Sequence, residues 1–153
     1  MFDAANKMII PVELNGHTYL VDIRKQMSDA FKIWAKYENF ISFKETNEPN
    51  KANFVVVSVE DNIVSDTVLA MGFPKDVPSK AFIASDKFGG LLYFTNNIKT
   101  VVQLAYNYAK ENGLYNGSDQ NYIDIYVRAL FVHEIGHTLG LNHSLYYDIE
   151  LTH

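Results

Sequence analysis

The segment HEIGHTLGLNH, residues His133–His143, is the most informative stretch of this 153-residue chain. It begins with the pattern H-E-x-x-H, and on a helix two residues four positions apart project from the same face. The imidazoles of His133 and His137 can therefore bind one Zn²⁺ together. Glu134 adjoins the first of them, where its carboxylate can take a proton from a metal-bound water. The segment thus predicts a zinc site on a helix, with a general base beside it.

Gly140 and His143 extend this pattern beyond the helix. Glycine tolerates the left-handed backbone conformation that often ends a helix and turns the chain sharply. Such a turn can bring His143 back to the metal as a third ligand. Three protein ligands leave a fourth position for water, which is the arrangement of a catalytic zinc site rather than a structural one.

The composition is that of one globular domain, residues 1–153, with 48% hydrophobic and 20% charged residues. There is no cysteine, which excludes disulfides, thiolate metal sites and a cysteine nucleophile. A net charge of −5 without a basic cluster argues against nucleic acid or an anionic membrane as the partner. We expect a monomer by default.

The first residues, MFDAANKMIIPVEL, do not resemble a signal peptide, because they lack a basic start, a long apolar core and a cleavage site. No apolar run is long enough to span a membrane. Two locations stay open: the chain is cytoplasmic by default, or secreted if a leader was removed.

Hydrophobic periodicity indicates a mixture of strands and helices. Strands are expected at Met8–Leu14, His17–Asp22, Phe54–Val59, Thr67–Phe73, Lys80–Ser85 and Leu91–Phe94. Asn15-Gly16 predicts a turn after the first of them. Helices are expected at Ile23–Glu38, Asn97–Glu111 and Tyr122–Leu139. Strands with one early helix, followed by helices, predict an α+β domain in which the helices pack on one face of a sheet.

The same residues resemble a known family. HExxHxxGxxH is the metzincin signature, and Ser144 after the third histidine resembles the matrixins, the group of the matrix metalloproteinases. FKIWAKYENFISFKETNEPNKANFVVVSV, Phe31–Val59, resembles their first helix, second strand and third strand, and VLAMGFP, Val68–Pro74, resembles their edge strand. The similarity covers about residues 8–151. It implies a zincin-like α+β domain: a twisted mixed sheet of about five strands, an early backing helix and a late active-site helix.

The resemblance also implies a function. The three histidines would be the ligands of one catalytic Zn²⁺, and Glu134 would be the general base that activates the zinc-bound water. The chain would then be a zinc endopeptidase that hydrolyses an extended peptide or protein substrate. The edge strand at Leu69 and Ala70 would pair with that substrate through backbone hydrogen bonds.

Two departures from the family concern its architecture. Residues 95–120 look like an insertion, because matrixins join the fifth strand to the active-site helix more briefly. Counting from His143, the methionine of the family's tight turn under the zinc falls on Leu151, where leucine can supply a similar apolar floor. The part of the family domain that follows this turn, with the outer wall of the specificity pocket, is expected to be missing.

Other departures concern metals and latency. Met71 and Phe82 stand where two histidine ligands of the family's structural zinc are expected, so we do not expect that second zinc. A calcium site is poorly supported, since Asp86 remains but Ala84 replaces an expected carboxylate. Because this chain has no cysteine, nothing in it can form the family's cysteine-on-zinc latch.

Two other functions stay open. The chain could be a zinc-binding module that kept the site, has little proteolytic activity and serves a binding or structural role. It could also be a zinc hydrolase for a non-protein amide. Glu134 favours catalysis, because a purely structural zinc does not need a carboxylate beside it.

Overall fold

The computed structural model describes residues 8–38, 41–46, 48, 52, 54–58, 70–74, 90–95, 97–141 and 143. Its strands are β1 (Ile9–Leu14), β2 (His17–Asp22), β3 (Phe54–Ser58), β4 (Ala70–Pro74) and β5 (Gly90–Phe94). Its helices are α1 (Ile23–Tyr37), α2 (Ile98–Glu111) and α3 (Asp119–Thr138). This order confirms the α+β class predicted from the sequence.

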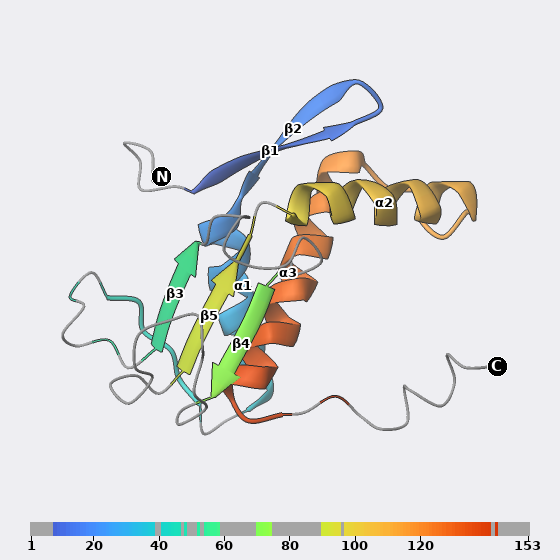
Figure 1. Ribbon diagram of the computed structural model, residues 1–153. Coiled ribbons are helices and arrows are strands. Elements are labelled where there is room, and N and C mark those ends of the chain that lie inside the picture. Colours follow the sequence, from blue (N-terminus) through green and yellow to red (C-terminus); the bar gives the residue numbers. More distant parts are fainter. Residues whose placement is uncertain are drawn as a thin grey trace.

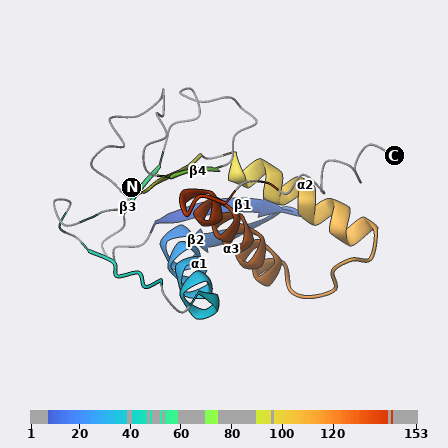
Figure 2. The same ribbon diagram turned by 90° about the horizontal axis from the view of Figure 1, so that it is seen from below.

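The helices gather around α3, the longest of those described (Figure 1). α1 packs against α3, and α3 also contacts β4 and β5. Seen from below, α1 and α3 lie side by side next to the strands, while α2 extends along the hairpin of β1 and β2 (Figure 2). None of the described helices is both long and apolar enough to cross a membrane.

A tight turn at Asn15 and Gly16 joins β1 to β2. Both residues have positive φ, 52° and 76°, which is the backbone of a type I′ turn and explains the preference for Asn-Gly at this place. The strands pair in antiparallel register from Ile9 opposite Asp22 to Leu14 opposite His17. The turn predicted from Asn-Gly is therefore confirmed.

The other strands form a separate mixed sheet in the order β3-β5-β4. β3 runs parallel to β5, and β4 runs antiparallel to it, so β4 lies at an edge of this sheet. The expected single sheet of about five strands is thus not what the described residues form. The backbone groups of β1 and β2 form hydrogen bonds with each other across their short turn. Within the described ranges neither strand pairs with β3, β4 or β5.

The family resemblance predicts a strand between α1 and β3. This strand is not found, because residues 41–46 contain no strand. Phe43 instead packs its ring against Phe31 of α1, with 4.6 Å between the ring centres. Phe43 can pack on α1 in this way without the backbone hydrogen bonds that a strand would need. The strand expected at Lys80–Ser85 lies outside the described residues, as do residues 67–69 before β4.

α3 begins at Asp119, three residues earlier than its hydrophobic pattern predicts. Ser118 is the reason, since its side-chain oxygen accepts a hydrogen bond from the backbone N–H of Asn121 at 3.4 Å. This N-cap satisfies one of the amide groups that a helix start leaves without a partner. Asp22 caps α1 in the same way, accepting from the backbone N–H of Lys25 at 3.0 Å.

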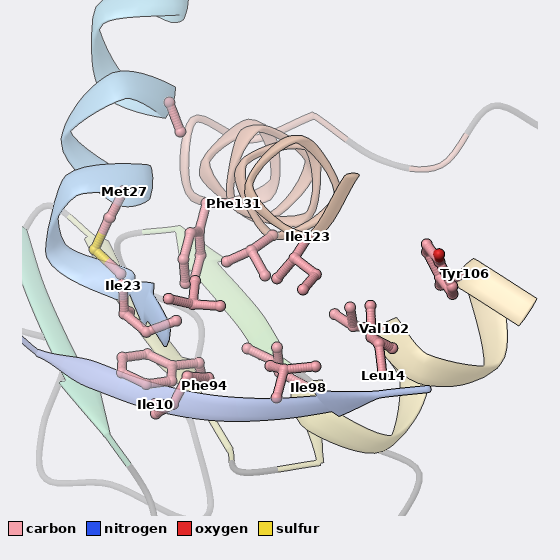
Figure 3. Packing of buried hydrophobic residues seen from close by; sticks show 14 of the residues in the cluster. Ile10, Leu14, Ile23, Met27, Phe94, Ile98, Val102, Tyr106, Ile123 and Phe131 are labelled. Carbon is pink, nitrogen blue, oxygen red and sulfur yellow. The ribbon is translucent and has the colours of Figure 1, made fainter. Parts of the chain in front are cut away.

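The core is built along one face of α3 (Figure 3). Ile123, Val127, Phe131 and Ile135 recur every four residues, and each is fully buried. Each such side chain contributes roughly 1.5–3 kcal/mol by leaving water. This burial fixes the rotation of α3 about its axis, so it also fixes the direction in which the histidines on its other faces project.

Candidate metal centre

The last two turns of α3 carry His133 and His137, and a sharp turn after the helix brings in His143. Gly140 has a φ of +92°, the left-handed region that favours glycine. Its N–H donates to the carbonyl of His137 at 2.9 Å, and the N–H of Leu141 donates to that of Gly136 at 3.0 Å. These two bonds are the pair of a Schellman motif, so the glycine ends α3 in the predicted manner.

The three imidazoles converge on one point. The Nε2 atoms of His133, His137 and His143 are 3.0 Å apart in every pair. A tetrahedral zinc ion with nitrogen ligands at about 2.0–2.1 Å would hold those nitrogens about 3.3 Å apart. The observed separation is close to this value, so the donor set fits one zinc ion. The structure therefore brings together the three residues that the sequence predicts as ligands.

The tautomer of His137 is set by a backbone group. Its Nδ1 lies 2.8 Å from the carbonyl oxygen of Leu141. A carbonyl can only accept a hydrogen bond, so the proton sits on Nδ1 and the lone pair of Nε2 is left for a metal. Sequence reasoning missed this contact, because a backbone carbonyl is present at every residue and has no signature in the side-chain pattern.

His133 is biased toward its neutral form. Burial lowers the pKa of its imidazole, and the neighbouring charges of His137 and His143 lower it further. A metal ligand must be unprotonated, so a lowered pKa reduces the competition between protons and metal at this nitrogen. The electrostatics of the cluster agree with its geometry.

Glu134 follows His133 on α3 and is buried, with 7% of its surface exposed. Carboxylates are rarely buried unless they have a partner or a function. It adjoins His133 in the chain, which is the position that the sequence predicts for a general base.

The remaining predicted residues are only partly covered. Ala70 is the first residue of β4, the edge strand that packs beside α3. Leu69, Leu151 and the positions that bear on calcium, Ala84 and Asp86, lie outside the described residues.

The chain was also compared with known proteins. The family model described as Matrixin matches residues 13–149, which includes the whole of α3 and all three histidines. No curated protein and no solved structure gives a significant match.

Proposed function

The chain belongs to the matrixin family, and from this premise we propose that it is a zinc-dependent endopeptidase. The observation that carries the proposal is the convergence of three Nε2 atoms at 3.0 Å from one another, with the buried Glu134 next to the first. Three imidazole ligands would leave a fourth zinc position open for reacting groups, which a structural zinc site would close.

In this proposal His133, His137 and His143 hold one Zn²⁺. The bound ion supplies Lewis-acid chemistry, polarising the scissile carbonyl and lowering the pKa of a water. Glu134 takes one proton from the attacking water, whose oxygen forms the new bond to the carbonyl carbon. Glu134 then gives the proton to the amine nitrogen as the peptide C–N bond breaks.

The substrate in this proposal is an extended peptide. β4 lies at the edge of the three-stranded sheet and beside α3, so its outer backbone groups can pair with an added strand. Leu69 and Ala70 would make these backbone contacts. Such pairing recognises the peptide backbone without regard to its side chains, and it would hold the scissile bond in line with the histidine cluster.

The test is cleavage of a quenched peptide by the wild type, with and without a chelator, beside Glu134→Gln. The amide keeps the size of the side chain but cannot accept the proton, so we expect a loss of about 10²–10⁴-fold in kcat with one zinc still bound per chain. Glu111→Gln, at the end of α2, is the matched control and should retain full activity.

Each other result has a clear meaning. Equal background rates for the wild type and Glu134→Gln, with zinc bound to both, would show a zinc-binding module without proteolysis. Turnover of small amides but not of peptides would show a different hydrolase. Failure of the wild type to bind zinc would rule out the metal site itself.

A further inference from the structure

The only tryptophan of the chain, Trp34, makes a long-range contact to the helix that carries the histidines. It lies in the last turn of α1, which runs beside α3 (Figure 2). Its indole Nε1–H donates to the backbone carbonyl of Val132 at 2.9 Å, across 98 positions of sequence. Val132 is the residue directly before His133.

The same indole also lies against Gly136, the residue directly before His137. A Cβ atom placed on Gly136 would come within 3.1 Å of Cζ2 of Trp34, which is closer than ordinary van der Waals contact. Glycine at this position therefore allows α1 and α3 to approach closely. One side chain thus contacts the residues that precede both histidines of α3.

These two contacts act on a single helical turn. In an α-helix the carbonyl of residue 132 also accepts the N–H of residue 136, so the indole donates to one end of this backbone hydrogen bond and packs against the other. Moving or rotating this turn would shift His133 and His137 together. Functional sites need positioning to within about 0.5 Å, and groups behind the ligands supply it.

We propose that Trp34 is a positioning residue of the metal centre, holding the α3 turn that presents His133 and His137 at the spacing one metal ion requires. This inference rests on the proposed function, because it concerns the same site. Trp34 does not touch the metal or the substrate in this role. It acts through the backbone at Val132 and Gly136.

The first test replaces Trp34 with phenylalanine, which keeps an aromatic ring but removes the N–H donor. We measure zinc affinity by competition with a chelator and the visible spectrum of the Co²⁺-loaded protein. Loss of a supporting group around metal ligands typically weakens metal binding by about 10–100-fold, and we expect a loss in this range with an altered Co²⁺ spectrum. Because the site itself is distorted, kcat should fall while KM stays close to the wild-type value.

Met27→Ala is the matched control. Met27 lies two turns earlier on α1 and is a buried part of the core, so its truncation weakens the packing of the same helix. We expect a lower Tm for this variant, with zinc affinity within about twofold of wild type. A Trp34→Phe variant that loses only thermal stability, with the affinity and spectrum of wild type, would overturn the proposal.

A double-mutant cycle gives a second test. Gly136→Ala should weaken zinc binding in the wild-type background, because the added methyl group pushes against the indole. In the Trp34→Phe background the smaller ring leaves room, so the same change should cost less affinity. Unchanged affinity in Gly136→Ala alone, or equal penalties in both backgrounds, would contradict the inference, and the first of these does not require Trp34→Phe to fold.

The two proposals can fail separately. If the wild type binds no zinc, the proposed function and this inference fail together. If the wild type binds zinc and cleaves peptides but Trp34→Phe behaves in the same way, only the positioning role fails. The affinity and Co²⁺ measurements also decide the role of Trp34 in a protein that binds zinc without cleaving peptides.

Discussion

His143 is the residue on which the convergence of the cluster most depends, because it alone among the three histidines lies outside α3. Its Nε2 nevertheless sits 3.0 Å from those of both His133 and His137. Two histidines on one helical turn form a pair in many sequences, whereas a third donor at the same distance gives a group of three that could hold one metal ion. Catalytic zinc sites use three protein ligands, so the third is decisive.

We therefore expect His143→Ala to weaken zinc binding at least about 100-fold, more than the loss of a supporting residue would. Zinc content after dialysis against a weak chelator measures this effect. His17→Ala is the control, since His17 lies on the hairpin and contacts the backbone carbonyl of Asn15 instead. Equal zinc retention in His143→Ala and His17→Ala would show that His143 is not a ligand.

Among the elements, the C-terminus of α3 determines whether His143 can reach the other two histidines. The chain reverses at Gly140, whose φ of +92° is one that other residues adopt only with strain. The position of this turn was predicted from the sequence, because a glycine after a periodic apolar stretch is a local signal. The start of α3 lies three residues before the start of its apolar pattern, because the cap at Ser118 precedes that pattern.

Gly140→Ala should cost about 1–2 kcal/mol in the stability of the folded turn. If the chain relaxes this strain by opening the turn, His143 moves away, and zinc affinity should fall about tenfold, because 1.4 kcal/mol corresponds to a factor of ten. Gly113→Ala is a matched control, because Gly113 has a φ of +65° at the end of α2, away from the histidines. A similar drop in zinc affinity for both variants would show a general loss of stability rather than a role for this turn.

At the scale of the whole molecule, Asp119 joins three elements through hydrogen bonds. The hydroxyls of Tyr106, on α2, and Tyr19, on β2, donate to its two carboxylate oxygens at 2.5 and 2.9 Å. Asp119 itself begins α3, where a negative charge also interacts favourably with the helix dipole. The hairpin, α2 and α3 therefore meet at one ionised group.

This arrangement predicts a pH dependence of stability. The hydrogen bonds from Tyr106 and then Tyr19 lower the pKa of Asp119 below its ordinary value of 3.8. A lowered folded-state pKa stabilises the fold above the unfolded pKa, and this contribution is lost as the pH falls through the folded value. Asp119→Asn should therefore show a shallower loss of stability below about pH 5 than the wild type.

The measurement is urea unfolding of the metal-free protein between pH 3 and 7, so that loss of a bound metal does not contribute and the histidines affect the wild type and the variant alike. Asp124→Asn, on the same helix, is the control and should keep the wild-type slope. Identical pH slopes for the wild type and Asp119→Asn would show that the two tyrosine hydrogen bonds do not contribute to acid stability.

Local sequence was enough to place most of the described helices and strands, the Asn-Gly turn and the three converging histidines. Periodicity, caps and turns depend on residues within about four positions of one another, and such neighbours can be read directly from the chain. The match to the matrixin family over residues 13–149 agrees with that reading. The metal-ligand pattern lies within eleven consecutive residues, so it needed no knowledge of the fold.

Only the tertiary structure decided what surrounds these elements. The division of the strands between two sheets and the docking of Phe43 on Phe31 left no signal in the local pattern. The contact of Trp34 with Val132 spans 98 positions, and the close approach to Gly136 depends on how α1 packs against α3. Contacts of this kind arise from the path of the whole chain, because burial of apolar faces, rather than the residues next to each partner, brings the two helices together.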